Sequence, residues 1–391
     1  MLYFLRILQT SNGKAVKALA NMMDYLIWRG DLTFSQAEFN EVDNLIFSEL
    51  VYVDFAGIVP GINEKKSISL KEASEIFFTH HTEEEIQEKV CMTKSAAFLM
   101  REMAKTKRFS NIMLSDYVED IDKIEQSQFC AMKIELEDGS IFVSYSGTDE
   151  TIVGWKENFN MSFLPETPGQ LKAVEYLNYV GASDTKSLRV GGHSKGGNLA
   201  IYASIHCKKN IQEKIMAVYN NDGPGVSADV LKKEEYHNLL SKIYTIIPES
   251  SIVGMILEHE GDYEIVKSSK KGAMQHDPMS WEVEGPSFIY VKSIAEGSIL
   301  LDKTLRAVMA KMDIRQREEF FDTVFNILEE GEIYTVEDLA KIKWKQFVEL
   351  WRLRNKLNDE DKDVLSKTFR MLWDESNRTL KERVIKKREK E

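Results

Sequence analysis

The sequence predicts an α/β protein, in which helices cover a mostly parallel sheet and further helices are added at both ends of the chain. Between residues 128 and 266, short apolar segments of strand length alternate with segments of helical periodicity, as in parallel sheets covered by helices. The flanking segments are mainly helical in their periodicity. We therefore expect a helical N-terminal region at 1–120 packed on the core, an α/β core at 121–297 and a helical C-terminal region at 298–391.

Length and composition narrow the class of protein. The chain has 391 residues, enough for a large core with an accessory part. Its net charge of −12 argues against a nucleic-acid-binding surface. Cys91, Cys130 and Cys207 lie far apart without metal-ligand spacing, which favours reduced thiols, no metal or cofactor, and a cytoplasmic location. No apolar run is long enough to span a membrane, although the short apolar segment Met1–Leu8 allows a weak peripheral membrane contact.

The N-terminal region has three segments with the apolar spacing of helices. They are Lys14–Trp28, Phe39–Phe55 and Thr82–Lys105. The last begins with Thr82 followed by Glu85, the spacing of a capping box.

The core begins with a predicted hairpin. Phe129–Leu136 and Ile141–Tyr145 are expected strands, joined at the turn-forming pair Asp138-Gly139. The remaining expected strands are 188–190, Ile215–Tyr219, Ile243–Ile247 and Tyr263–Val266, and the expected helices are Pro168–Val180, Asn198–Ile205 and Val230–Lys242. Thr167 and Pro168 are typical of the start of a helix.

A G-x-S-x-G pattern joins the expected strand 188–190 to a helix. Gly192-His193-Ser194-Lys195-Gly196 follows a short strand and precedes a helix, the context of a nucleophile elbow in an α/β-hydrolase. The glycines leave room where strand and helix crowd together, and the helix N-terminus favours negative charge. The Lys195 N–H would then be one oxyanion donor. The alternative is a glycine-rich turn with an ordinary serine.

A serine nucleophile needs a base, and the base follows the serine in proteins of this kind. His276 lies in the loop after the last predicted strand, which is the expected position. His259, in an acidic stretch, is the alternative. His206 and His237 fall on predicted helices and are expected to point away from the site or to be solvated.

Two carboxylates are candidates for the acid that orients the base. Asp222 and Glu249 each follow a predicted strand. We favour Asp222, because a tight glycine-containing loop holds it firmly; its alternative role is an Asx turn. Thr148, after the strand Ile141–Tyr145, is the candidate for the second oxyanion donor, the alternative being a local hydrogen bond in a turn.

The C-terminal region contains apolar and aromatic side chains at helical spacing. One stripe includes Trp344, Phe347 and Trp351, and another includes Phe369 and Trp373. We expect these stripes to pack against each other and against the core, with cofactor or lipid binding as the less favoured alternative. The basic C-terminal end is expected to be solvated. Contact of this end with an anionic surface is the less favoured alternative.

Several segments resemble known families. GGHSKGGNLA resembles the elbow of the class 3, or fungal-type, lipases, and SYSGTDETIVGWKENFNMSF resembles their oxyanion segment, with Thr148 and Trp155 at the matching positions. The wider pattern is still more similar to a bacterial family of unassigned function within the α/β-hydrolase superfamily. Residues 20 to 330 carry this pattern in the segments DYLIWRGDLTFSQAEFNEVDNLIFSELVYVDF, NNDGPG, PESSIVGMILEH and QHDPMSW.

The chain departs from the lipase pattern at three positions. Lys195 replaces a leucine-like residue, which suggests a polar or anionic substrate portion. Ser251 stands near the position where the lipases have their aspartate, which is a second reason to favour Asp222. Ser146 replaces the arginine of the oxyanion segment and removes an ion pair.

These observations predict a serine hydrolase that cleaves an acyl ester, small or lipid, through an acyl-serine intermediate. A thioesterase or acyltransferase would use the same residues. A non-catalytic protein that keeps the fold as a binding scaffold is the alternative of another class. The sequence leaves the oligomeric state undetermined.

Overall fold

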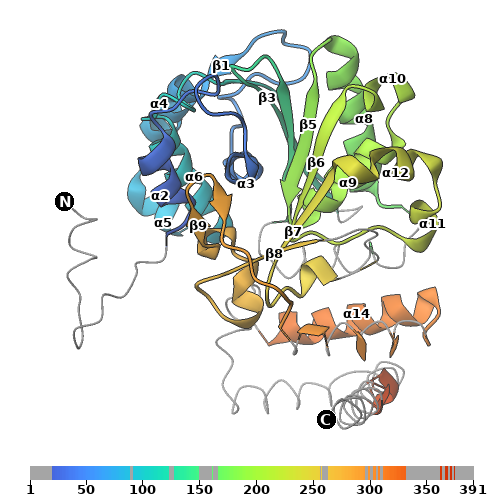
Figure 1. Cartoon of the computed structure of the whole chain (residues 1–391). Helices are drawn as coiled ribbons and strands as arrows, with labels where there is room; N and C mark the ends of the chain where they lie inside the picture. Colours follow the sequence, from blue (N-terminus) through green and yellow to red (C-terminus); the bar gives the residue numbers. More distant parts are fainter. Residues whose placement is uncertain are drawn as a thin grey trace, which may run out of the picture.

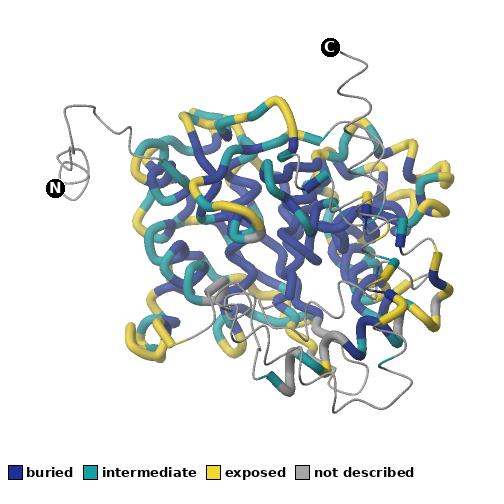
Figure 2. The backbone as a smooth tube through the Cα atoms, turned by 90° about the horizontal axis from the view of Figure 1, so that it is seen from below, coloured by how far each residue is buried: buried dark blue, intermediate teal, exposed yellow. Residues whose placement is uncertain are grey.

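Figure 1 shows the computed structural model of the chain. It describes residues 20–88, 91–122, 127–148, 161, 166–255, 257, 263–295, 298–299, 303–304, 307–308, 311–331, 362, 366–368, 370–371 and 374. Figure 2 shows the buried segments gathered in the middle of the molecule, with exposed segments around them.

The described residues form one eight-stranded sheet with the strands in sequence order, β1 to β8. The strands are β1 (Ile68–Ser69), β2 (Met113–Asp122), β3 (Ser127–Glu135), β4 (Ile141–Tyr145), β5 (Leu188–His193), β6 (Ile215–Asn221), β7 (Ile243–Pro248) and β8 (Glu264–Val266). Strands β4 to β8 pair in parallel, whereas β1 to β4 pair antiparallel. The predicted α/β class with a mostly parallel sheet is therefore confirmed, as is the β3–β4 hairpin.

The helices that connect the parallel strands lie on one face of the sheet. Parallel strands in sequence order, joined by right-handed crossovers, place every connecting helix on the same side. Helices α8 (Pro168–Ser183), α9 (Lys195–His206) and α12 (Glu234–Leu239) occupy this side in Figure 1. This topology leaves the opposite face of the sheet without connecting helices.

The N-terminal helices cover that opposite face (Figure 1). They are α2 (Met22–Arg29), α3 (Glu41–Leu50), α4 (Leu70–His80), α5 (Glu83–Glu88) and α6 (Cys91–Met103). The side chains of β4 show the two faces: Phe142 belongs to the core beneath α3, whereas Ile141 and Val143 belong to the core beneath α8 and α9. Helix α3 packs directly on β5.

Local capping signals set several helix starts. The predicted box of Thr82 and Glu85 is present, with a hydrogen bond in each direction of 2.8 and 3.2 Å. Thr167 likewise caps α8 together with Gln170. Helix α4 was not predicted, although Ser69 and Glu72 form a third box at its start. Asn40 caps α3, which begins two residues later than the predicted segment.

Strand β2 was also not predicted, because an irregularity interrupts its alternation. Its register against β3 shifts between Ser115 and Val118, and Asp116 has a φ of +53°. An extra residue in a strand moves the following side chains to the other face, so a period of two is lost in the sequence.

The expected helix Val230–Lys242 is divided into shorter pieces. They are α11 (Ala228–Leu231), α12 and a 3₁₀ turn at Leu240–Lys242, with Lys233 in an extended conformation between the two helices. The remaining elements are the helix α14 (Ile314–Glu330) and several short ones: α10 (Lys209–Gln212), β9 (Val283–Glu284), β10 (Ser287–Phe288) and 3₁₀ turns at Val253–Met255, Gly272–His276 and Pro278–Ser280.

The C-terminal stripes that contain Trp344, Phe347, Trp351, Phe369 and Trp373 lie outside the described residues. Among the helices that the structure describes, none combines the length and the apolar character needed to cross a membrane. Burial raises the pKa of the Cys130 and Cys207 thiols to about 12, and both cysteines are unbridged.

Candidate active site

Ser194 stands at a sharp turn between β5 and α9. Its φ of +56° and ψ of −130° are unusual for a residue with a side chain, and its N–H donates to the Asn221 carbonyl at 2.9 Å. Such a conformation at a strand-to-helix turn is characteristic of a nucleophile elbow. The expected strand, turn and helix are therefore all present, and they hold the Ser194 hydroxyl at the carboxyl end of β5.

Two glycines allow this turn. A Cβ atom on Gly192 would lie 2.5 Å from the carbonyl oxygens of both Gly196 and Tyr145, and a Cβ on Gly196 would collide with the same Tyr145 carbonyl. No side chain fits at such separations, so the close approach of β4, β5 and α9 requires glycine at both positions of the motif.

The structure brings Ser194, His276 and Asp222 together from three separate loops. His276 Nε2 lies 3.0 Å from Ser194 Oγ, and His276 Nδ1 lies 2.7 Å from Asp222 Oδ2. The ionised carboxylate of Asp222 can only accept, so Nδ1–H donates to it and Nε2 is left to accept the serine hydroxyl proton. The Asp222 side chain is 1% exposed and the His276 side chain 16% exposed.

Further hydrogen bonds hold the Asp222 carboxylate in place. Its Oδ1 accepts from the Ser251 hydroxyl and, at 3.2 Å, from the Gly254 N–H. A Cβ on Gly254 would lie 2.5 Å from this oxygen, so a glycine is needed there. Ser251 stands near the position of the lipase aspartate, and here it supports the carboxylate that the preceding strand supplies. The sequence did not predict this role.

The alternative acid, Glu249, contacts a residue next to His276. Glu249 accepts a hydrogen bond from Gln275 Nε2 at 3.4 Å, one residue away from His276, whereas the His276 ring is bonded to Asp222. His259 lies outside the described residues. His206 is part of α9, where its Nε2 lies 2.7 Å from Lys233 Nζ, as expected for a helix residue turned away from the site.

The loop that carries His276 is fixed through its backbone. The indole N–H of the fully buried Trp281 donates to the Gln275 carbonyl at 2.9 Å, and His193 Nε2 lies 2.9 Å from the His276 carbonyl. A carbonyl only accepts, so His193 donates from Nε2. Burial, with a smaller effect of His276, holds the pKa of His193 well below its ordinary value, which keeps the ring neutral. The sequence did not predict these roles for His193 and Trp281.

The candidate oxyanion loop passes directly over the serine. Thr148 is buried in the segment after β4, and a Cβ on Gly147 would lie 3.1 Å from Ser194 Cβ. Ser146, the replacement for the lipase arginine, donates its hydroxyl proton to the Gly147 carbonyl at 2.8 Å. Trp155 lies outside the described residues.

The side chain of Lys195 does not lie where its suggested contact with a polar or anionic substrate would require. It opens α9, as the oxyanion assignment of its N–H requires, but its side chain is completely buried. An ammonium group at 0% exposure does not face solvent beside the serine, so the polar or anionic substrate portion inferred from Lys195 lacks an exposed cation to contact.

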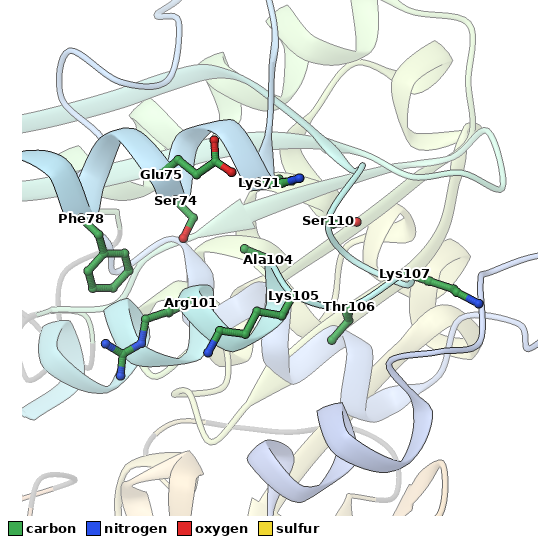
Figure 3. A pocket seen from close by; sticks show the side chains of 10 residues that line it. All are labelled: Lys71, Ser74, Glu75, Phe78, Arg101, Ala104, Lys105, Thr106, Lys107 and Ser110. Atoms are coloured by element: carbon green, nitrogen blue, oxygen red, sulfur yellow. The ribbon is translucent and has the colours of Figure 1, made fainter.

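A cavity of about 530 Å³ lies elsewhere, between α4 and the end of α6 (Figure 3). Its charged lining consists of Lys71, Arg101, Lys105 and Lys107 against the single carboxylate of Glu75. It shares no lining residue with the Ser194 site. Among the described residues, no group of three or more His, Cys, Asp and Glu side chains is arranged to hold a metal ion.

The sheet topology and the strand–turn–helix geometry give the protein an α/β-hydrolase-like fold. The chain belongs to the Mbeg1-like family, whose sequence profile matches residues 103–326, more than half of its length. The expected resemblance to a lipase-like family is confirmed.

The other comparisons are more distant. Among solved structures, the chain is similar to a crystal structure of M37 lipase, with 18% sequence identity over 54% of this chain and 68% of the lipase and a TM-score of 0.36. No functionally curated protein matches the chain.

Proposed function

We propose that this protein is a serine hydrolase that cleaves an acyl ester through an acyl-serine intermediate. The observation that carries the proposal is the pair of contacts of His276, 3.0 Å to Ser194 Oγ and 2.7 Å to Asp222 Oδ2, at the carboxyl ends of parallel strands. A nucleophile within hydrogen-bond reach of a base, with the base oriented by a third group, is the general signature of nucleophilic catalysis.

In the first step, Ser194 Oγ attacks the ester carbonyl carbon while its proton passes to His276 Nε2. Asp222 stabilises the imidazolium that forms. The N–H groups of Lys195 and Thr148 are assigned to the oxyanion, since the first lies at the positive end of α9 and the second belongs to the loop over the serine. The ester bond then breaks, and the alcohol leaves with the proton from His276.

In the second step, a water molecule attacks the acyl-serine carbonyl carbon. His276 Nε2 takes a proton from this water, and Ser194 Oγ leaves and recovers that proton as the acid product departs. The same sequence with a thioester substrate gives a thioesterase, and with an alcohol in place of water it gives an acyltransferase. These two readings remain alternatives within the same chemistry.

The experiment that tests the proposal is active-site labelling with a fluorophosphonate probe, combined with p-nitrophenyl ester turnover. Ser194→Ala should abolish labelling and reduce turnover by about 10⁴- to 10⁶-fold, and adding His276→Ala should cost little more because the pair acts as a unit. Ser183→Ala, which removes the hydroxyl of an exposed serine at the end of α8, is the matched control and should behave as wild type.

Two results would reject the proposal. A folded wild-type chain that the probe does not label would favour the non-catalytic scaffold. A Ser194→Ala chain with the full wild-type rate would place the nucleophile elsewhere. Comparing esters and thioesters of the same acyl group, with and without an added alcohol, separates the hydrolase from the thioesterase and the acyltransferase.

A further inference from the structure

Helix α3 and the turn after it carry buried polar side chains toward the active-site end of the sheet. They are Asn44, Ser48, Glu49 and Tyr52, with exposed fractions of 0, 0, 1 and 8%. Their spacing of four, one and three residues places them along one side of the helix. Buried polar groups are costly unless they are paired, so their partners indicate what this side of α3 does.

The first partner is Asn221, the residue before Asp222. Asn44 Nδ2 donates to Asn221 Oδ1 at 2.8 Å, and Asn221 Nδ2 lies 3.1 Å from Ser48 Oγ. Asn221 also contacts the elbow strand, since its Nδ2 donates to the Gly192 carbonyl at 3.1 Å and its carbonyl accepts the Ser194 N–H. Helix α3 therefore fixes the chain that carries both the serine and the aspartate.

The second contact joins the oxyanion loop to the elbow. The Tyr52 hydroxyl accepts the Gly147 N–H at 3.0 Å and lies 3.3 Å from the His193 carbonyl, to which it donates. His193 immediately precedes the serine, and Gly147 immediately precedes Thr148. We call helices α2 to α6, with the turns between them, the N-terminal layer. One hydroxyl group from this layer thus bonds both to the segment that carries the nucleophile and to the segment that carries an oxyanion donor.

The third contact reaches the base. The His193 ring donates from Nε2 to the His276 carbonyl and lies with its centroid 4.7 Å from that of the His276 ring. On its other side, His193 Nδ1 lies 3.5 Å from the Tyr52 hydroxyl and 3.4 Å from Glu49 Oε1. His193 therefore lies between α3 and the histidine loop and touches both.

We propose that Tyr52 and His193 are positioning residues, through which the N-terminal layer sets the relative placement of nucleophile, base and oxyanion donor. This inference rests on the proposed hydrolase function. Neither side chain needs to touch substrate. Their effect on rate comes through geometry, since a displacement of about 1 Å in an aligned site can cost on the order of 100-fold.

The test compares two tyrosine variants that each lose one buried hydroxyl. Tyr52→Phe should slow turnover about 10- to 100-fold, with KM within about threefold of wild type, because alignment acts on the chemical step. Tyr176→Phe is the matched control, since that hydroxyl donates to the Asp116 carbonyl at 2.8 Å, beneath α8 and away from the site. It should leave both kinetic constants unchanged.

A pair of histidine variants gives a rescue test. His193→Leu removes the donor to the His276 carbonyl and should slow turnover to a similar extent. His193→Gln keeps an N–H near the Nε2 position and should recover to within about tenfold of wild type. If His193→Leu does not fold, the comparison of Tyr52→Phe with Tyr176→Phe still tests the positioning role.

A second readout does not depend on turnover. The proton between His276 Nδ1 and Asp222 should give a downfield imidazole resonance in the NMR spectrum, identified by its loss in Asp222→Asn. Tyr52→Phe should shift or broaden this resonance, and Tyr176→Phe should not. Equal turnover in both tyrosine variants together with an unchanged resonance would overturn the positioning role. Absence of probe labelling in wild type would instead reject the hydrolase, leaving the resonance to decide the positioning role.

Discussion

At the residue scale, the local environment of each carboxylate decides which one can orient His276. Asp222 is 1% exposed, contacts His276 Nδ1 and is supported by Ser251 and Gly254. Glu249 is instead bonded to the neighbouring Gln275. A carboxylate held by several donors is fixed in position, as a residue that orients an imidazole must be.

We therefore predict that Asp222→Asn lowers kcat for ester turnover by about two to four orders of magnitude, because the amide removes the charge and favours the wrong imidazole tautomer. Glu249→Gln should cost less than about tenfold, since it changes a side chain that does not contact the His276 ring. Thermal melts check that both variants fold. An inactive Glu249→Gln beside a near-normal Asp222→Asn would reverse the assignment, and two near-normal variants would indicate a serine–histidine dyad.

At the element scale, a buried ion pair holds α3 against the rest of the N-terminal layer. Arg108 donates from Nε to Asp43 Oδ1 at 2.8 Å and from Nη2 to Oδ2 at 2.5 Å, with both side chains at 0% exposure. Its guanidinium also reaches the carbonyls of Ala37 and Glu38, and the Tyr25 hydroxyl donates to the same carboxylate. This network joins α2, α3 and the segment between them.

Arg108→Met should lower the free energy of unfolding by about 3–5 kcal/mol, because it leaves the buried Asp43 carboxylate and the carbonyls without their donor. Urea titration measures the loss. Lys232→Met is the control, since Lys232 forms an exposed ion pair with Asp229 whose removal should leave stability unchanged. A loss below about 1 kcal/mol in Arg108→Met would mean that the other donors to Asp43, such as the Tyr25 hydroxyl, satisfy the carboxylate without Arg108.

At the scale of the whole molecule, the N-terminal layer covers one face of the sheet. The core beneath it includes Met132, Ile134 and Phe142 of the sheet, together with Leu45 and Phe47 of α3. The family profile begins at residue 103 and so excludes α2 to α5 and all but the end of α6. Without these helices, one face of the sheet would be exposed to water.

We accordingly predict that a fragment of residues 103–326 does not fold as a cooperative unit, whereas the full chain unfolds its N-terminal layer and its sheet in one calorimetric transition. The fragment should bind a hydrophobic dye such as ANS strongly, because its exposed sheet face lacks the cover of α3. A fragment with a sharp melting transition and no dye binding would show that the layer is a separate domain.

The sequence by itself determined the features that depend on neighbouring residues. The strand, turn and helix around Ser194, the hairpin at Asp138-Gly139 and the caps at Thr82 and Thr167 all follow from local backbone geometry and hydrogen bonding, and all are present. The order of strands and helices in the core also followed from periodicity, apart from the division of the segment around α12. Strand β2 was not predicted, because its irregular register removes the alternation of apolar and polar residues on which a strand prediction depends.

Only the tertiary structure decided which distant groups meet. Asp222 and Glu249 both follow strands, but it is Asp222 that lies against His276, with its other carboxylate oxygen bonded to the Gly254 N–H in the 3₁₀ turn Val253–Met255. His193 occupies a variable position of the motif, so its contact with His276, 83 residues away, leaves no local pattern. The same holds for Tyr52, whose partners Gly147 and His193 come from the loop after β4 and from the end of β5. The physical reason is that hydrogen bonds between segments far apart in sequence depend on how the layers pack, which no local periodicity encodes.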